Sequence, residues 1–307
     1  MNAPASEIDL KNCDSKTLAR ILSLVENESE GYEKILFSLE PDEKVPVIGI
    51  TGAPGAGKST LISSLLKEII SKENKYLHGK GIAVLAVDPT SPFSHGALLG
   101  DRLRMSEHFN HPKVFIRSLA TRGSLGGLSG KTMEITDVLR ATGFDYIFIE
   151  TVGVGQSEVE IASLAETTVV VMVPESGDEV QTIKAGIMEI ADIFVVNKAD
   201  REGADKIIKH IKTAAHLRPK GEWDTPILKT IATQQEGIPE LIEKINEHHC
   251  LPHKQKNNSL VFEKALRLIR DYKMKSIDKE ELKKKLNESQ KKKDFNLYRF
   301  IDSNFKS

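Results

Sequence analysis

Residues 47–60 read Val47-Ile48-Gly49-Ile50-Thr51-Gly52-Ala53-Pro54-Gly55-Ala56-Gly57-Lys58-Ser59-Thr60. An apolar run ends in glycines, and apolar residues then return at helical spacing from Leu61 to Ile69. Residues 52–59 match G-x-x-x-x-G-K-[ST], the phosphate-binding P-loop, whose backbone N–H groups point into one concavity at a helix N-terminus. Strand, glycine loop and helix follow in the required order. The sequence therefore predicts a nucleotide-binding α/β domain.

The loop itself supplies the first candidate ligand contacts. The predicted nucleotide-binding residues there are Gly52, Ala53, Pro54, Gly55, Ala56, Gly57, Lys58, Ser59 and Thr60. Lys58 is expected to reach the β- and γ-phosphates as a point charge, which also makes it a candidate catalytic residue. The hydroxyl of Ser59 is expected to bind Mg²⁺.

The composition is that of an ordinary soluble protein. The chain has 307 residues, of which 39% are hydrophobic and 28% charged, enough for one large core with appendages. No apolar run approaches the length of a membrane span, and the N-terminal residues lack the features of a signal peptide, so a cytoplasmic protein without membrane contact is expected. Cys13 and Cys250 are the only cysteines and lie far apart, which argues against a disulfide framework.

Seven apolar runs alternate with helix-length segments. The predicted strands are Val45–Thr51, Ile82–Val87, Val114–Ser118, Asp145–Thr151, Thr168–Val173, Asp192–Val196 and Pro226–Thr230. This alternation indicates βαβ units and a P-loop NTPase fold with a mostly parallel sheet flanked by helices. Two helices are expected before it, within residues 8–40, the first capped by Asp14 or Ser15. The predicted domains are an N-terminal helical extension (1–44), a P-loop GTPase domain (45–252) and a C-terminal helical arm (253–307).

The C-terminal arm is basic, with a net charge of +8 from Lys254 to Ser307 against −9 for the preceding residues. Acidic residues alternate with the basic ones at helical spacing, which favours solvated helix faces over a nucleic-acid-binding surface. Between Val261 and Phe305 the helices also have narrow apolar stripes that need another surface to cover them. That surface is either the main domain or a second subunit, and a dimerisation arm is favoured.

Three acidic residues are expected at the edge of the sheet that holds the P-loop. Glu150 ends the fourth predicted strand in the Walker B arrangement, where the carboxylate meets Mg²⁺ or its water shell. Asp88 ends the second strand and is either a Mg²⁺ contact or a cap or turn residue. Asp101 lies in a glycine-flanked loop that could close over a γ-phosphate. The candidate metal ligands are thus Ser59, Asp88, Asp101 and Glu150, and Asp101 and Glu150 are also candidate catalytic residues.

The segment after Glu150 bears on hydrolysis. Gly153 is placed to give its N–H to the γ-phosphate. Val154 stands where Ras-type GTPases have the glutamine that orients water, and Gln156 comes two residues later. The sequence therefore predicts slow intrinsic hydrolysis, or rearrangement of this loop when another molecule docks. Gln156 and Glu158 are the candidates for orienting the water.

Residues 197–200 read N-K-A-D and match the guanine motif N-K-x-D. Asp200 is expected to accept hydrogen bonds from the ring N1–H and the exocyclic amine, Asn197 to bond N7 or the loop, and the Lys198 stem to stack on the base. Adenine would leave the carboxylate unpaired, which costs several kcal/mol by the penalty for a buried unpaired charge. Discrimination for GTP over ATP is therefore predicted.

A further base contact is expected after the last predicted strand. The N–H of Ala232 could bond the guanine O6. Ile231 stands where G domains usually have serine, which weakens the support for this loop without abolishing it.

Histidines cluster only at residues 248–253. Metal ligands on one helix face need i, i+3 or i+4 spacing, which only His249 and His253 satisfy, and Pro252 interrupts the helix between them. A metal site is therefore not expected there, nor at His108 and His111.

Together these stretches resemble the MeaB/ArgK/MMAA family of P-loop GTPases over roughly residues 5–250. The matching segments are Gly52–Thr60, Ala86–Pro89, Leu99–Arg102, Ser118–Gly123, Glu150–Glu158 and Asn197–Asp200. The resemblance implies a GTP-hydrolysing chaperone of an adenosylcobalamin-dependent acyl-CoA mutase, usually methylmalonyl-CoA mutase, that gates cofactor loading and protects the holoenzyme. It also implies a homodimer, slow hydrolysis accelerated by the mutase, and Mg²⁺ held by residues matching Ser59, Asp88, Asp101 and Glu150. The mutase and the cobalamin rest on this resemblance alone.

Two other functions remain as alternatives. A metallochaperone GTPase of the urease or hydrogenase maturation type shares this architecture, but such proteins typically present Cys/His motifs, and this sequence has no C-x-C or C-x-x-C. A kinase that transfers phosphate to another molecule is the second alternative. The guanine motif speaks against ATP as its donor.

Overall fold

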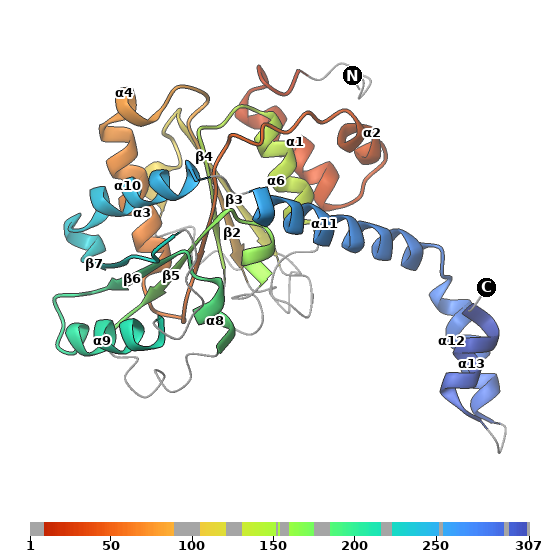
Figure 1. Ribbon diagram of the computed structural model, residues 1–307. Helices are drawn as coiled ribbons and strands as arrows, with labels where there is room; N and C mark the ends of the chain where they lie inside the picture. The colour runs from red at the N-terminus through yellow and green to blue at the C-terminus, as the bar shows by residue number, and fades with distance from the viewer. Residues whose placement is uncertain are drawn as a thin grey trace. The chain divides into compact units, whose positions relative to one another are not determined.

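Seven parallel strands form one sheet in the computed structural model of the protein (Figure 1). The structure describes residues 9–88, 105–120, 131–151, 153, 160–174, 185–215, 223–251, 254–291 and 295–305. The chain divides into two units, Met1–Asn257 and Asn258–Ser307. The division falls inside helix α11 (Lys254–Lys275), a few residues after the predicted boundary.

The strands confirm the sequence prediction, with ends shifted by two residues at most. They are β1 (Val47–Thr51), β2 (Ile82–Asp88), β3 (Val114–Ala120), β4 (Tyr146–Glu150), β5 (Thr167–Met172), β6 (Ile193–Asn197) and β7 (Ile227–Thr230). Their order across the sheet is β3-β2-β4-β1-β5-β6-β7, and every described pair is parallel. The P-loop strand β1 is central, so the carboxyl ends of β4 and β5 lie on either side of its own carboxyl end.

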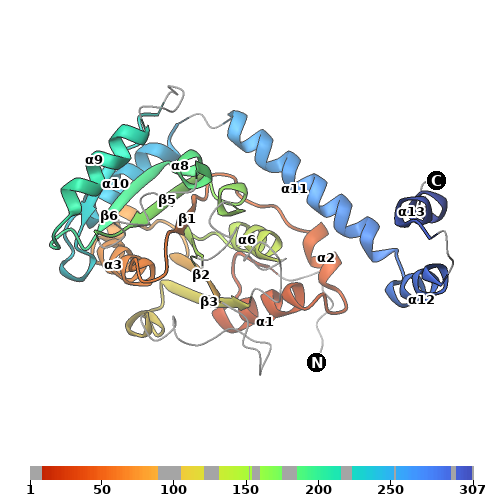
Figure 2. The same cartoon turned by 90° about the horizontal axis from the view of Figure 1, so that it is seen from below.

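Helices cover both faces of the sheet, which is why the strands read as continuous apolar runs (Figures 1 and 2). On one face, α3 (Lys58–Ser71), α4 (Glu73–Tyr76) and α10 (Ile238–His249) pack on alternate strand residues such as Val84. On the other face, α1 (Ser15–Glu26) and α6 (Thr132–Ala141) pack on the intervening strand residues, such as Leu85. Helices α8 (Ala185–Ile190) and α9 (Ala204–Ala215) extend this second layer over β5 and β6.

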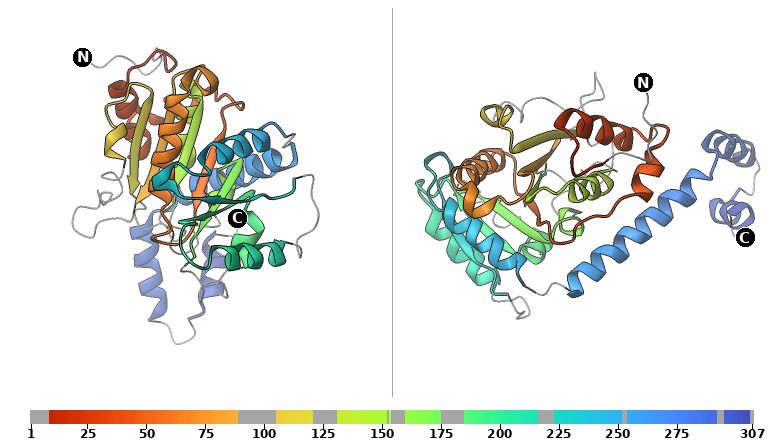
Figure 3. Two further views of the ribbon diagram at one scale, coloured as in Figure 1. Left: turned by 90° about the vertical axis from the view of Figure 1, so that its left-hand side faces the viewer. Right: turned by 90° about the horizontal axis from the view of Figure 1, so that it is seen from above.

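The N-terminal extension forms the predicted helices α1 and α2 (Tyr32–Phe37). Asp14 caps α1 by accepting from the Thr17 N–H at 2.7 Å, as expected. Arg117 of β3 donates to Ala19 O at 3.0 Å and pairs with Glu26 at 2.5 Å, which joins α1 to the edge strand. Figure 3 shows α1 beside this strand. The apolar side of α1 is buried in the core through Leu18, Ile21, Leu22 and Val25. The extension is therefore an integral part of the main unit.

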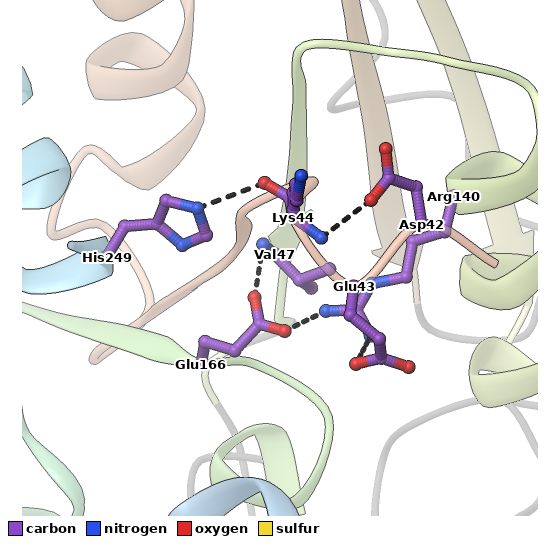
Figure 4. A network of polar contacts seen from close by, with 7 residues as sticks. All are labelled: Asp42, Glu43, Lys44, Val47, Arg140, Glu166 and His249. Atoms are coloured by element: carbon purple, nitrogen blue, oxygen red, sulfur yellow. Dashed lines mark hydrogen bonds and ion pairs between the residues drawn. The ribbon is translucent and has the colours of Figure 1, made fainter. Parts of the chain in front are cut away.

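A polar network holds the amino-terminal edge of the sheet, opposite the P-loop (Figure 4). One carboxylate oxygen of Glu166 accepts from the Val47 N–H at 2.8 Å, and the other accepts from Arg140. Arg140 also reaches Glu43 at 3.4 Å. His249 Nε2 bonds Lys44 O at 3.0 Å. These bonds fix the start of β1 between α6, α10 and the residue that precedes β5.

Replacing Arg140 with methionine is expected to lower the free energy of unfolding by about 3–5 kcal/mol, because it removes a buried partner of the Glu166 carboxylate. Urea unfolding at pH 7, followed through the fluorescence of the single tryptophan, measures this change. Lys244→Met, which removes the more exposed Lys244–Glu247 pair, is the control and is expected to leave the midpoint unchanged. A wild-type midpoint for Arg140→Met would contradict the role of this network.

The second unit consists of helices. It contains most of α11, then α12 (Lys279–Gln290) and α13 (Leu297–Phe305). Asp278 caps α12 by accepting from the N–H groups of Glu280 and Glu281. Exposed apolar side chains recur along α11 and α13: Val261, Phe262, Leu266, Leu268, Ile269, Tyr272, Met274, Leu297, Tyr298, Ile301 and Phe305. The apolar side chains expected from the sequence thus lie at the surface of this unit.

Among the described helices, none is both long enough and apolar enough to cross a lipid bilayer.

Candidate functional site

The loop after β1 is in direct contact with the guanine motif. Gly57 caps α3 in a left-handed conformation, with φ at 87°. A Cβ atom at this position would lie 2.5 Å from Asn197 Nδ2. Glycine is therefore required here both by the backbone conformation and by the approach of a side chain 140 residues later in the sequence.

Lys58 lies along the inside of this loop. Its Nζ donates to Gly52 O at 2.8 Å and to Ala53 O at 3.1 Å, and the residue is 6% exposed. Gly153 also approaches this point, because a Cβ built there would lie 2.6 Å from Lys58 Nζ. The P-loop lysine and the glycine after the Walker B strand therefore lie close together.

Ser59 and Glu150 come together beside the loop. The Ser59 hydroxyl donates to Glu150 Oε1 at 2.7 Å, and the residues are 2% and 3% exposed. Their approach follows from the pairing of β1 with β4, in which Ile50 lies opposite Glu150. Both are hard oxygen donors of the kind that Mg²⁺ prefers, so this pair fits the predicted metal site.

The remaining predicted ligands are placed only in part. Asp88 ends β2, whose Ala86 pairs with Glu150, so its backbone lies at the same sheet edge. The side chain of Asp88, and all of Asp101, Gln156 and Glu158, lie outside the described residues.

Asn197 connects three parts of the site. It ends β6 and is 2% exposed. Its Nδ2 donates to Ala56 O of the P-loop at 3.0 Å. Its Oδ1 accepts from the Thr230 hydroxyl at 3.1 Å and from the Ala232 N–H at 3.2 Å. The Ala232 N–H, which is predicted to bind guanine O6, thus already donates to Asn197 Oδ1. A bound base would place O6 either instead of this acceptor or beside it, with the N–H shared between the two oxygens.

The other guanine-motif residues lie at the surface of the same edge. Lys198 has φ at 56°, a left-handed conformation that is uncommon for a residue with a side chain. Its Nζ donates to Gly55 O at 2.9 Å, so its stem extends toward the P-loop. Asp200 is exposed, and its carboxylate is therefore accessible to a ligand.

One contact within the site had no signal in the sequence. The hydroxyls of Thr51 and Thr151 lie 2.9 Å apart and join the ends of β1 and β4, just before the P-loop and just after Glu150. Threonine at a strand end is common, so only the strand order reveals this link.

Of the histidines considered as metal ligands, those that the structure describes have other contacts, and His253 lies outside the described residues. His248 Nδ1 lies 2.8 Å from the Thr167 hydroxyl, and His108 Nε2 lies 3.1 Å from the Ser63 hydroxyl. Burial lowers the pKa of His108 and of His249, which keeps both rings neutral at pH 7. Within the described residues, no three His, Cys, Asp or Glu side chains gather in a way that could hold a metal ion.

Comparison with known proteins gives a consistent result. A family model described as "Methylmalonyl Co-A mutase-associated GTPase MeaB" matches residues 18–291. A Pyrococcus abyssi protein named "Putative GTPase" is 52% identical over 245 residues, which cover 78% of this chain and 74% of that protein. The GTPase ArgK of Escherichia coli is 35% identical over 243 residues, 76% of this chain and 71% of its own length.

Two further matches extend this comparison. The mitochondrial methylmalonic aciduria type A homolog of Caenorhabditis elegans is 35% identical over 229 residues, 73% of this chain and 55% of that protein. Among solved structures, a LAO/AO transport system kinase superposes with a TM-score of 0.63 at 25% identity, covering 96% of this chain and 89% of the other. The parallel sheet, the helices around it and the P-loop are those of a P-loop GTPase fold.

Proposed function

The chain belongs to the family of methylmalonyl-CoA mutase-associated GTPases, and we propose that it binds and hydrolyses GTP with Mg²⁺ to gate adenosylcobalamin loading and protection of an acyl-CoA mutase. Methylmalonyl-CoA mutase is the proposed client. The observation that supports the nucleotide part most directly is the bond from Asn197 to Ala56, which joins the guanine motif to the phosphate loop. The proposed client rests on family membership.

The phosphate contacts are proposed for the loop and the start of α3. The backbone N–H groups of residues 52–60 and the positive end of the α3 dipole suit an anion. Lys58 would exchange its bonds to Gly52 O and Ala53 O for phosphate oxygens. The N–H of Gly153, close to the same ammonium group, would contact the γ-phosphate.

Mg²⁺ is proposed to be held by Ser59 and Glu150, with Asp88 and Asp101 as further candidates. When bound, the ion would neutralise charge on the β- and γ-phosphate oxygens. Ser59 would then turn its hydroxyl oxygen from Glu150 toward the ion. Gln156 remains the candidate for orienting the attacking water.

Base recognition is proposed for four residues. Asp200 would accept from guanine N1–H and the exocyclic amine, and the Lys198 stem would stack on the ring. Asn197 links the turn at Ala232 to the P-loop, because it bonds both Ala232 and Ala56. The Ala232 N–H would bond O6. Adenine has a donor where guanine has O6 and a bare acceptor at N1, so both contacts would disfavour ATP.

Glu150→Gln is expected to slow single-turnover phosphate release by about 10- to 100-fold, because it removes a negative charge that would hold Mg²⁺, the ion that stabilises charge in the transition state. GDP affinity measured in EDTA should stay within about threefold of wild type, because the carboxylate contributes through the metal and not through the base. Glu247→Gln, at an exposed position on α10, is the control and should change neither quantity. A loss of GDP affinity with unchanged phosphate release would reverse the role given to Glu150.

The proposal that methylmalonyl-CoA mutase is the client is tested by mixing the two purified proteins. Steady-state GTP turnover is measured with and without purified methylmalonyl-CoA mutase, and co-elution of the two proteins is compared in GDP and in a non-hydrolysable GTP analogue. Faster turnover and nucleotide-dependent co-elution would support the chaperone role. Turnover unchanged by the mutase, with no co-elution in either nucleotide, would count against it.

A homodimer is also proposed. The exposed apolar side chains of α11 and α13 need a covering surface, and a second copy would supply one of matching character. Sedimentation equilibrium of the full chain tests this. A dimer mass supports the proposal, and a monomer mass at micromolar concentration contradicts it.

The two alternative functions have their own readouts. GTP labelled in the γ-phosphate should release label only as inorganic phosphate, and transfer to any other acceptor would favour a kinase. Equilibrium dialysis that found tightly bound Ni²⁺ or Zn²⁺ would favour a metallochaperone.

A further inference from the structure

Ser64 lies on α3, about one and two-thirds turns beyond Lys58, and its side chain reaches another part of the site, at Ala232. The residue is 5% exposed. Its hydroxyl lies 2.6 Å from Ala232 O and 3.0 Å from Thr60 O. A hydroxyl has one proton to donate, and the shorter contact is the one to Ala232. A helix that begins in the P-loop thus reaches the loop expected to bind the base.

Ala232 is held on both sides. Its N–H donates to Asn197 Oδ1 at 3.2 Å, and its carbonyl accepts from Ser64 at 2.6 Å and from the Gln235 N–H at 3.3 Å. Its methyl group is buried in the same core cluster as Leu61 and Ile238, and the residue is 4% exposed. The backbone of Ala232 is therefore held by neighbours from α3 and β6, and its N–H is directed at Asn197 Oδ1.

The residue before it explains why such support is needed. G domains usually place a serine there, whereas this chain has Ile231, which has no side-chain hydrogen-bonding group. The backbone N–H of Ile231 bonds Glu236 O at 3.1 Å, which closes the turn. Ser64 supplies a buried hydroxyl to this turn from a different element.

We propose that Ser64 is a positioning residue for guanine recognition, whose hydroxyl holds the backbone of Ala232 in place so that the Ala232 N–H bonds the O6 atom of the base, in place of Asn197 Oδ1 or together with it. This inference rests on the proposed binding of guanine nucleotides and assigns part of the selectivity to a residue outside the N-K-x-D motif. It links the phosphate and base subsites through α3. A purely structural role for Ser64, in which it ties α3 to the end of β7, is the competing explanation.

The positioning role and the purely structural role predict different effects of Ser64→Ala on nucleotide affinity. Only the positioning role makes the loss of affinity depend on the O6 atom of the ligand. Isothermal titration calorimetry of the full-length Ser64→Ala protein measures the affinity for three diphosphates in the presence of Mg²⁺. GDP and inosine diphosphate both have O6. In 6-thioguanosine diphosphate, sulfur, a weak acceptor, replaces this oxygen. Ser63→Ala is the matched control, because Ser63 is the neighbouring buried serine of α3 and contacts Glu107 and His108 instead of the turn that contains Ala232.

A positioning role predicts a loss of about five- to tenfold in affinity for GDP and for inosine diphosphate, the size of one neutral hydrogen bond. The loss for 6-thioguanosine diphosphate should be less than about twofold, because the affected bond is already weak in that ligand. Ser63→Ala should bind all three ligands as wild type does.

Other outcomes overturn the inference. Equal losses for GDP and 6-thioguanosine diphosphate would show a general structural role, and unchanged GDP affinity would show no role. The same selective loss in Ser63→Ala would assign the effect to α3 as a whole. If the wild-type chain bound none of these nucleotides, the proposed function itself would fail, a result distinct from the others.

Discussion

Lys58→Ala is expected to weaken GTP binding by at least about 10²-fold. Two charge-assisted hydrogen bonds to phosphate oxygens, at about 1.5–3 kcal/mol each, would correspond to about 10²- to 10⁴-fold. The lower end is the better expectation, because the ammonium group gives up its bonds to Gly52 O and Ala53 O when it binds phosphate. Titration calorimetry with a non-hydrolysable GTP analogue and Mg²⁺ measures the change.

Guanosine separates the loss of phosphate contacts from a loss of fold. Because it has no phosphate, its weaker affinity should be the same for wild type and Lys58→Ala. A variant that lost guanosine as well would have a distorted base pocket. Wild-type affinity for the GTP analogue would show that Lys58 does not contact phosphate.

Asp200→Asn is expected to weaken GTP binding by about 10²-fold or more, a loss of at least ~2.7 kcal/mol. The amide keeps one acceptor but presents a donor to the exocyclic amine of guanine, so one good bond becomes a clash of donors. Asp200 is exposed, so the fold does not depend on its carboxylate. The affinities for GTP and xanthosine triphosphate are measured side by side.

Xanthine is the informative ligand, because it has an oxygen where guanine has the amine. Asp200→Asn should therefore bind xanthosine triphosphate more tightly than wild type does, reversing the preference. Asp205→Asn, at an exposed residue of α9 paired with Lys229, is the matched control and should leave both affinities unchanged. Retained GTP affinity in Asp200→Asn would mean that the base binds elsewhere.

The strands and the general motifs were predictable because each depends on a short stretch of sequence. Strands buried on both faces, such as β5 with Val169, Val170 and Val171, read as unbroken apolar runs. The P-loop and residues 197–200 follow such runs directly. Since parallel strands share one carboxyl edge, these motifs had to lie at the same edge of the sheet.

The contacts between motifs were not predictable, because they depend on strand order. That Glu150 meets Ser59 requires β4 beside β1, and that Asn197 meets Ala56 requires β6 one strand beyond β5. The bond from Ser64 to Ala232 joins residues 168 positions apart and has no local signature. Ala232 was expected to be a guanine contact, but its present bond to Asn197 Oδ1 could not be inferred.

A guanine nucleotide is expected to bind with Mg²⁺ at the carboxyl edge of this sheet. The decisive measurement is titration calorimetry of the full-length chain with a non-hydrolysable GTP analogue and Mg²⁺, repeated with the matching ATP analogue. We expect saturable binding of one GTP analogue per chain, with the ATP analogue weaker by about 10²-fold or more. No heat with the GTP analogue, or equal affinity for both nucleotides, would contradict it.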